Sequence, residues 1–427
     1  MNSWNLQSLK EVLHNPEELN AAQSETLLHL MNRHFPPQRF EKQLEQRRRA
    51  LKHAAQSKHL LEGTHQHFPD FLSHSQLDPS PLSLKGWGIV FTAGGEGERL
   101  RLSLLSQGVP ADELKEFTKA TYPLKGFFKN YGTLHTNLAM TSWMCRETGF
   151  DIPVIITTGP QGSITHRVIP RILEENSNFG LKNIRLVAQD ERLHFTLEEK
   201  IVCQITDDTP CPVTQPDETG GPLMKLKQIS DTDSISALDW LSELGCEKIL
   251  AVQATALYDR DMLPLMARAA QNSDCLGVGI LRTSFEPKDP FGTFVSLERD
   301  GSTFTSIIEQ DIRNDATRSV KDPSGRFHLP FNTGFYAFDC NILRKHDLPD
   351  YATPPKQILP DLPRSPKVGY AATDILPLGS SPIILTVDPQ MYGVIKTADD
   401  LEKLTQAGIQ YGLKEICAKV EQDLPKR

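Results

Sequence analysis

The part of the sequence best suited to chemistry is a glycine-rich loop. Residues 91–100 read FTAGGEGERL, so an apolar run that ends at Ala93 is followed by Gly94, Gly95 and Gly97. Glycines directly after a strand allow backbone N–H groups to face a polyphosphate with no Cβ in the way. Ligands of α/β sheets bind at this position, the carboxyl end of a strand. A tight turn without a ligand would also explain the glycines, so the loop alone does not decide between the two.

Cations near the loop favour the ligand. Arg99 lies within the loop, and Lys119 follows further along the chain. Such fixed cations can stabilise the charge of a nucleoside triphosphate and of departing pyrophosphate. The loop has neither the Gly-Lys-Ser/Thr of a Walker motif nor the spacing of the G-x-G-x-x-G dinucleotide motif. Both of those site types are therefore excluded.

Apolar runs that alternate with helical segments must position this loop. From residue 86 onward, several runs are apolar throughout, which is typical of strands buried on both faces of a largely parallel sheet. The strand candidates are 88–93, 153–158, 184–188, 248–252 and 276–281, and the helix candidates are 134–148, 164–175, 234–244 and 260–271. This alternation predicts a doubly wound α/β domain with helices on both faces of the sheet.

The same reading predicts three regions. Residues 1–85 carry apolar residues at helical spacing and many good helix formers, and they end in a linker, 74–83, rich in proline and serine. We expect a helical N-terminal region over 1–85, the α/β domain over 86–400 and a short C-terminal helix over 401–427.

Composition excludes several classes of protein. The 427 residues are 38% hydrophobic and 23% charged, which is ordinary for a globular chain, and the net charge of −8 argues against a globally basic nucleic-acid-binding surface. No apolar run approaches the roughly 18 residues of a membrane span, and no secretory signal is visible. The seven cysteines are scattered and form no zinc motif. We expect a cytoplasmic protein that binds neither nucleic acid nor a membrane.

Taken in order, the motifs resemble those of the UDP-sugar pyrophosphorylase family, which includes UTP–glucose-1-phosphate uridylyltransferase and UDP-N-acetylglucosamine pyrophosphorylase. The loop at 94–100 is similar to the G-G-x-G-T-R-L loop of sugar nucleotidyltransferases, with Glu98 in place of threonine. Lys119 takes the position of the family's lysine, although a threonine precedes it where the family has proline. Residues 392–401, YGVIKTADDL, resemble the segment F-x-P-V-K-T-x-x-D-L, which supplies a second phosphate lysine, here Lys396.

Further segments correspond to the base and sugar sites of the family. Gln189 takes the position of a glutamine near uracil, and Thr219 and Gly220 belong to a P-D-E-T-G-G loop similar to the family's P-D-G-N-G-G loop. Glu309 fits a glutamate after a β-hairpin strand, and Asn332 lies in a segment similar to the family's sugar-pocket segment. The resemblance implies that Gln189 and Gly220 contact uracil. It also implies that Thr219, Glu309 and Asn332 contact sugar hydroxyls.

The resemblance implies a fold and a reaction. The fold would be that of a nucleotide-diphospho-sugar transferase, Rossmann-like and GT-A-like, with a mixed sheet between helices. The reaction would transfer UMP from UTP to a sugar 1-phosphate and release pyrophosphate. Because the attacking phosphate is already an anion, positioning and charge neutralisation would carry catalysis. The loop glycines would bind the triphosphate, Arg99 and Lys119 would hold pyrophosphate, and Lys396 would bridge the α-phosphate and the sugar phosphate.

The sugar and the metal stay open at this stage. Residues 394–401 look more like the glucose enzymes, which favours glucose 1-phosphate, whereas the loop at 216–221 leans toward N-acetylglucosamine 1-phosphate. The family holds Mg²⁺ with an aspartate at the end of a central strand, where this chain has Gln253, a poor ligand for a hard cation. Mg²⁺ would then be carried by the triphosphate or approached by Asp259. The missing carboxylate also leaves a non-catalytic nucleotide-sugar-binding protein as an alternative, and an α/β protein of unrelated function as a further one.

Overall fold

The computed structural model describes residues 3–62, 64–95, 97–230, 233–281, 291–299, 301–310, 312–321, 329–357 and 364–424. The chain forms two compact units, each assembled from separate stretches of sequence. The first unit consists of Met1–Glu62, Asp190–Gly221 and Leu348–Ala371, and the second of Gly63–Gln189, Pro222–Asp347 and Ala372–Arg427. These boundaries differ from the predicted ones at 85 and 400. Two internal stretches join the N-terminal helices, and composition along the chain carries no signal for such long-range contacts.

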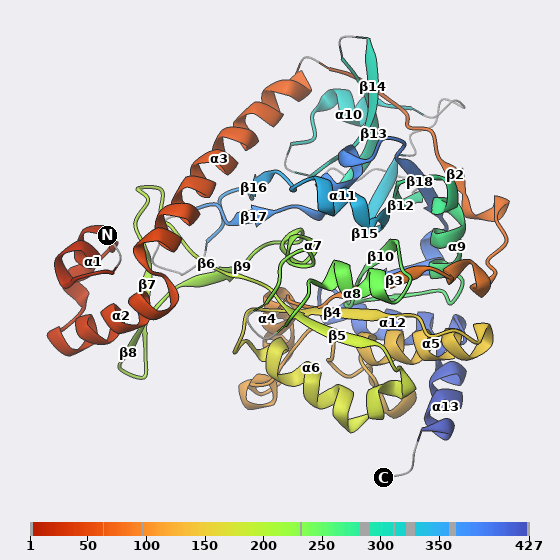
Figure 1. Cartoon of the computed structure of the whole chain (residues 1–427), viewed down its shortest axis with the longest axis horizontal. Coiled ribbons are helices and arrows are strands. Elements are labelled where there is room, and N and C mark those ends of the chain that lie inside the picture. The colour runs from red at the N-terminus through yellow and green to blue at the C-terminus, as the bar shows by residue number, and fades with distance from the viewer. Residues whose placement is uncertain are drawn as a thin grey trace. The chain divides into compact units, whose positions relative to one another are not determined.

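A mixed sheet forms the centre of the second unit (Figure 1). Within the described residues its order is β2-β18-β12-β15-β10-β3-β4-β5, and β1, β13 and β14 extend it beside β15. The strands are β1 (His65–His67), β2 (Leu72–Ser73), β3 (Trp87–Thr92), β4 (Val154–Thr158), β5 (Ile184–Ala188), β10 (Lys248–Gln253), β12 (Cys275–Leu281), β13 (Thr293–Arg299), β14 (Ser302–Ile308), β15 (Pro330–Asp339) and β18 (Ile383–Val387).

All five predicted strands belong to this sheet. The strands β10, β3, β4 and β5 are mutually parallel, as are β12, β18 and β2. Between these two parallel sets lies β15, antiparallel to both β10 and β12. The predicted mixed α/β fold is therefore confirmed. Because β1 and β2 pair with β13 and β18, the region before residue 85 is not wholly helical.

Helices cover both faces of the sheet. Ile89 of β3 shares the main apolar core with Leu138 of α5. The preceding residue, Gly88, points to the opposite face because side chains alternate along a strand. A Cβ on Gly88 would lie 2.6 Å from Leu241 of α8. The helices of this unit include α5 (Thr133–Thr148), α6 (Ile164–Glu175), α8 (Ala237–Glu243), α9 (Met262–Ala269), α10 (Asp315–Ser319), α11 (Cys340–Lys345), α12 (Asp399–Gln410) and α13 (Leu413–Asp423).

The C-terminal segment corrects one prediction. It forms two helices, α12 and α13, rather than one. The break falls at Gly412, whose φ of +68° is left-handed and ends the helical path. No helix among the described residues has the length and apolar character that crossing a membrane would require.

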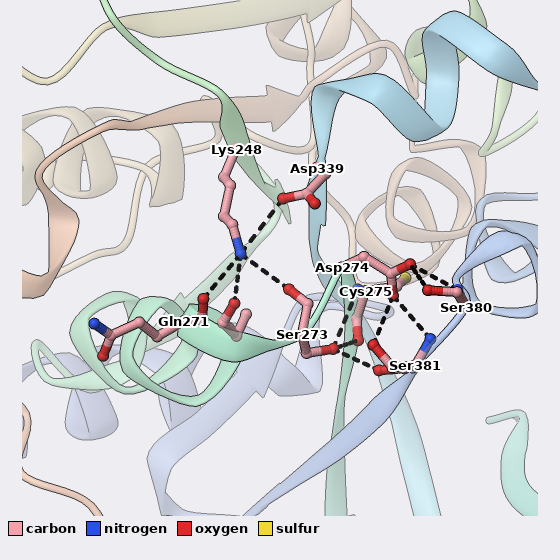
Figure 2. A network of polar contacts seen from close by, with 9 residues as sticks. Lys248, Gln271, Ser273, Asp274, Cys275, Asp339, Ser380 and Ser381 are labelled. Atoms are coloured by element: carbon pink, nitrogen blue, oxygen red, sulfur yellow. Dashed lines mark hydrogen bonds and ion pairs between the residues drawn. The ribbon is translucent and has the colours of Figure 1, made fainter.

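A polar network joins the amino end of β10 to the carboxyl end of β15 (Figure 2). The Lys248 ammonium, at the start of β10, donates to the carbonyl oxygens of Ala270 at 2.8 Å, Gln271 at 3.3 Å and Ser273 at 2.9 Å. It also pairs with Asp339 at 3.4 Å. Cations stabilise the last carbonyls of a helix in this way. The network therefore lies at one end of these strands. The carboxyl ends of the parallel strands lie at the opposite end.

The first unit combines helices with short hairpins. Its helices are α1 (Leu6–Val12), α2 (Ala21–His34) and α3 (Pro37–Glu62), and its strand pairs are β6 (Glu191–Leu193) with β9 (Thr214–Pro216), β7 (Cys203–Thr206) with β8 (Thr209–Pro212), and β16 (Asp350–Ala352) with β17 (Val368–Tyr370). Leu27 and Phe40 of the helices share an apolar core with Phe195 and Ile201. A buried ion pair joins Arg192 to Asp217. The helical character predicted for the N-terminus is present here.

Candidate active site

The glycine loop connects strand β3 to helix α4 (Glu98–Ser106). Hydrogen bonds extend the sheet up to the loop, because the Ala93 N–H donates to the Thr157 carbonyl at 2.9 Å. The loop ends at Gly97, which caps α4 with a left-handed φ of +77°. A helix whose first N–H groups follow such a turn presents a positive end to an anion. The predicted order of a strand followed by a glycine turn is therefore present, and helix α4 follows the turn.

The glycines of the loop have different neighbours. A Cβ on Gly94 would lie 2.3 Å from the amide nitrogen of Gln189, and a Cβ on Gly97 would lie 2.6 Å from the Cβ of Lys119. At both positions a larger residue would displace a side chain that the sequence assigns to the site. Gly95 differs, because no described atom beyond its chain neighbours lies within 4 Å of its Cβ position. The backbone there faces open space.

Cations from three segments gather beside the loop. A cavity of about 300 Å³ is lined by Gly97, Glu98, Arg99, Leu100, Lys119 and Lys396. The structure thus brings together the two lysines that lie far apart in the sequence, along with Arg99. Burial lowers the pKa of Lys119 to about 8, and the positive charges of Lys396 and Arg99 contribute to this shift. We call this cavity the phosphate pocket. An anion bound there would offset the repulsion between its positive charges.

The main chain of Lys396 is held on both sides. Strand β19 (Tyr392–Val394) pairs with β11 (Ala256–Tyr258) just before it. The N–H groups of Lys396 and Thr397 each donate to the Asp400 carboxylate at 2.8 Å. The Lys396 ammonium lies 3.6 Å from the centroid of the Phe291 ring. The position of the Lys396 main chain is therefore fixed, and its ammonium contacts an aromatic ring.

Gln189 follows strand β5 and is buried, with 7% of its surface exposed. Its N–H donates to the Thr158 carbonyl at 3.1 Å. Its side-chain oxygen is buried and has no hydrogen-bond partner among the residues that the structure describes. A buried acceptor without a donor costs about 1–3 kcal/mol. The Gln189 side chain, beside Gly94, therefore has a hydrogen-bond acceptor available at the carboxyl end of β5.

Asn332 and Glu309 lie near each other through Gly292. The Asn332 N–H donates to the Gly292 carbonyl at 2.9 Å, and a Cβ on Gly292 would be 3.2 Å from a Glu309 carboxylate oxygen. The Asn332 amide donates to the Tyr336 hydroxyl at 2.8 Å and accepts from the Gly334 N–H at 2.9 Å. In the ligand-free chain this amide holds the β15 backbone.

A second carboxylate accompanies Glu309. The pKa of Asp374 is raised to about 7, first by burial and then by the negative charge of Glu309. Sequence reasoning missed Asp374 because it stands in a 3-10 helix (Ala372–Leu378) and matches none of the motifs considered. The pairing of two acidic side chains far apart in sequence could only be seen in the fold.

Thr219 and Gly220 lie in the first unit. The Gly220 N–H donates to the Tyr370 carbonyl at 2.7 Å, and a Cβ on Gly220 would lie 2.8 Å from backbone atoms of Tyr370 and Ala371. Close backbone approach therefore explains this glycine. Thr219 is exposed. The roles predicted for both residues, at the base and at the sugar, stay predictions.

The residues where the family would hold Mg²⁺ do not fit that ion. The Gln253 amide nitrogen donates to the Thr333 carbonyl at 3.3 Å, so the position offers a donor and no anionic oxygen. The Asp259 carboxylate accepts from the Asp261 N–H at 2.9 Å. Within the described part of the chain, no three His, Cys, Asp or Glu side chains come together as a metal site would require.

The sheet, with antiparallel β15 between two parallel sets, and the glycine loop at the carboxyl end of β3 define a mixed α/β fold. No protein-family model matches the sequence, and no curated protein matches it. Among solved structures the same fold occurs in UDP-sugar pyrophosphorylases.

One such structure is UDP-N-acetylglucosamine pyrophosphorylase from Trypanosoma brucei in complex with an inhibitor, at TM-score 0.66 and 14% identity, covering 95% of this chain and 82% of that one. Another is UDP-glucose phosphorylase from Trypanosoma brucei, at TM-score 0.57 and 15% identity, covering 80% and 70%. A third is a mutant UDP-glucose pyrophosphorylase from Leishmania major in complex with UDP-glucose, at TM-score 0.56 and 12% identity, covering 90% and 78%. This chain has the fold of these enzymes.

Proposed function

We propose that this protein is a uridylyltransferase that transfers UMP from UTP to a sugar 1-phosphate. The observation that carries the proposal is the phosphate pocket, where Arg99, Lys119 and Lys396 meet beside a glycine turn at the end of β3. Three cations around one cavity suit a highly charged ligand, and burial together with the charges of Lys396 and Arg99 lowers the pKa of Lys119. The solved structures with this fold support the nucleotide and the sugar, because they are pyrophosphorylases of UDP-N-acetylglucosamine and UDP-glucose.

The proposed reaction is an in-line displacement at phosphorus. A phosphate oxygen of the sugar 1-phosphate attacks the α-phosphorus of UTP, and the bond from that phosphorus to the bridging oxygen breaks. Pyrophosphate leaves with the electron pair. The nucleophile needs no general base, so the protein acts by orienting both phosphates and neutralising the charge that builds up. Arg99 and Lys119 would hold the pyrophosphate, and Lys396 would contact the α-phosphate and the incoming sugar phosphate.

The backbone and the buried amide would complete the nucleotide site. The loop N–H groups around Gly95 face open space where phosphate oxygens could lie. The buried side-chain oxygen of Gln189, which accepts no hydrogen bond from the described residues, would accept from the uracil N–H. Asn332 and Glu309 would contact sugar hydroxyls. Mg²⁺ that accompanies the triphosphate would add charge neutralisation, and no step is assigned to a metal held by the chain.

The assay is release of pyrophosphate from UTP in the presence of a sugar 1-phosphate. We expect turnover with UTP and much less with ATP, GTP or CTP. Glucose 1-phosphate is the favoured acceptor and N-acetylglucosamine 1-phosphate the alternative, and the ratio of their kcat/KM values decides between them. Lys119→Met and Lys396→Met should each lower kcat by about 100-fold or more, since removal of one transition-state contact costs this much elsewhere. Near-normal turnover in both variants would refute the proposal.

A matched control separates the pocket from general loss of positive charge. Lys115 stands four residues before Lys119, is exposed and pairs with Asp112 at 2.6 Å. Lys115→Met should leave kcat within about twofold, because exposed ion pairs contribute little.

A second candidate is a non-catalytic nucleotide-sugar-binding protein. The amide of Gln253, which stands where the family has its metal aspartate, favours it. Binding of UDP-glucose with no pyrophosphate release under any divalent ion would support this candidate over the enzyme.

A further inference from the structure

Gln253 is a polar residue at a place where segments of the proposed site converge. It ends strand β10, and in the register of the sheet it lies opposite Thr92, the last residue of β3 before the glycine loop. Two residues further along the chain, the Thr255 carbonyl accepts from the N–H of Ile395 at 3.2 Å. Ile395 directly precedes Lys396. Gln253 therefore stands between the glycine loop and the segment that supplies a lysine to the phosphate pocket.

The side chain of Gln253 reaches the strand that carries Asn332. Its amide nitrogen donates to the carbonyl oxygen of Thr333 at 3.3 Å. A Cβ on Gly334, whose φ is +76°, would overlap the same nitrogen, so the glycine leaves the space that the amide occupies. The Gly334 N–H in turn donates to the Asn332 side chain at 2.9 Å. The amides of Gln253 and Asn332 thus lie beside one short stretch of β15.

The fold has little need of the Gln253 amide. The Thr333 carbonyl also accepts from the Tyr392 hydroxyl at 2.9 Å, and this second bond is buried. The contact from Gln253, at 3.3 Å, is longer than most hydrogen bonds between N–H groups and oxygen. The side chain is partly exposed, and its oxygen accepts no hydrogen bond from the residues that the structure describes. Its polar atoms are therefore accessible to a ligand, and removing them should cost little stability.

The neutral charge of this side chain suits direct contact with a diphosphate. A carboxylate at the same place would repel phosphate oxygens unless a divalent cation lay between them. An amide N–H can donate to a phosphate oxygen without a cation, and the amide oxygen can accept from a hydroxyl group. Positive charge for the diphosphate is supplied by the phosphate pocket, which is lined by Arg99, Lys119 and Lys396.

We infer that Gln253 contacts the bound nucleotide sugar directly through its amide, so that this chain binds a UDP-sugar without a divalent cation. The inference rests on the proposed function. It concerns the binding of the UDP-sugar, and Mg²⁺ that UTP carries with it has no part in this contact. Gln253 would act in recognition, through hydrogen bonds to phosphate or hydroxyl oxygens of the ligand.

Calorimetric titration of the full chain with UDP-glucose, and separately with UDP-N-acetylglucosamine, tests the inference in EDTA and in MgCl₂. We expect the Kd of the unchanged chain for the sugar that it binds to agree within about threefold between the two buffers. Gln253→Leu keeps the volume and removes the hydrogen-bonding groups, so it should raise Kd about 10-fold in both. Gln253→Glu should raise Kd at least about 10-fold in EDTA, and Mg²⁺ should recover most of this loss.

A matched control adds the same charge at the other end of the strands. Gln271 is exposed, lies shortly before β12 and accepts from the Arg268 guanidinium at 2.8 Å. Gln271→Glu should leave Kd unchanged in both buffers, because its carboxylate lies beside that guanidinium and away from the glycine loop. Urea unfolding of Gln253→Leu should match that of the unchanged chain, which shows that a loss of binding is not a loss of fold.

Two results would overturn the inference. One is binding by the unchanged chain that disappears in EDTA and returns with Mg²⁺, a comparison that needs no variant. The other is a Gln253→Leu chain that binds the UDP-sugar as tightly as the unchanged chain. Failure of the proposed function gives a different pattern, in which the unchanged chain binds neither UDP-sugar in either buffer.

Discussion

The charge state of Lys119 makes a prediction about pH. Its pKa in the ligand-free chain is lowered to about 8, first by burial and then by Lys396 and Arg99. With this value, the lysine is about 90% charged at pH 7 and about 10% charged at pH 9. The terminal phosphate of UTP loses its last proton near pH 6, so the ligand's charge changes little above pH 7. If only the charged lysine holds the phosphates, the association constant for UTP falls about tenfold between pH 7 and pH 9.

Isothermal titration calorimetry measures both the affinity and the protons exchanged. A bound polyanion favours the charged lysine, so its pKa rises on binding and the complex takes up about half a proton per UTP at pH 8. Repeating the titration in buffers of different ionisation enthalpy gives this number. Lys119→Arg carries a charge that does not titrate in this range, so its affinity should be flat. Constant affinity in the unchanged chain, or the same fall in Lys119→Arg, would refute the reasoning.

Three further predictions concern folding and the ligand space. Gly95→Ala should leave stability within about 0.5 kcal/mol, since its Cβ meets no described side chain, yet raise the KM for UTP at least about tenfold because the methyl group occupies phosphate space; an unchanged KM would contradict this. Lys248→Met should lower stability by about 1–3 kcal/mol in urea unfolding, because three carbonyl groups lose their donor, with kcat per folded molecule unchanged. For Asp374, whose pKa is raised to about 7, the folded state binds more protons than the unfolded state between about pH 4 and pH 7, so stability falls as pH rises through this window. Asp374→Asn should therefore gain urea stability at about pH 8 and not at about pH 4.

Much of the α/β core could be predicted from the sequence because its signals are local. The runs at 88–93 and 153–158 are largely apolar, and such runs become interior strands, here β3 and β4. The glycine loop after β3 could also be predicted, because glycines directly after an apolar run are a local signal. The order of the motifs predicted that Lys119 and Lys396 share one pocket. Their chemical roles stay predictions.

What the sequence could not supply depends on contacts between distant segments. Strand β15 (Pro330–Asp339) runs antiparallel to both of its neighbours in the middle of the sheet. The direction of a strand is set by the strands that it pairs with rather than by its residue types. The first unit takes in Asp190–Gly221 and Leu348–Ala371, whose composition does not distinguish them from their surroundings. Asp374 gains its significance only from the side chain beside it, Glu309.

The most direct test is a crystal structure of the protein with an α,β-methylene analogue of UTP, which cannot release pyrophosphate. Our account predicts the triphosphate over the loop of Gly94, Gly95 and Gly97, with the ammonium groups of Lys119 and Lys396 both within hydrogen-bonding distance of its phosphate oxygens. A triphosphate bound elsewhere, with either ammonium turned away from it, would contradict the account.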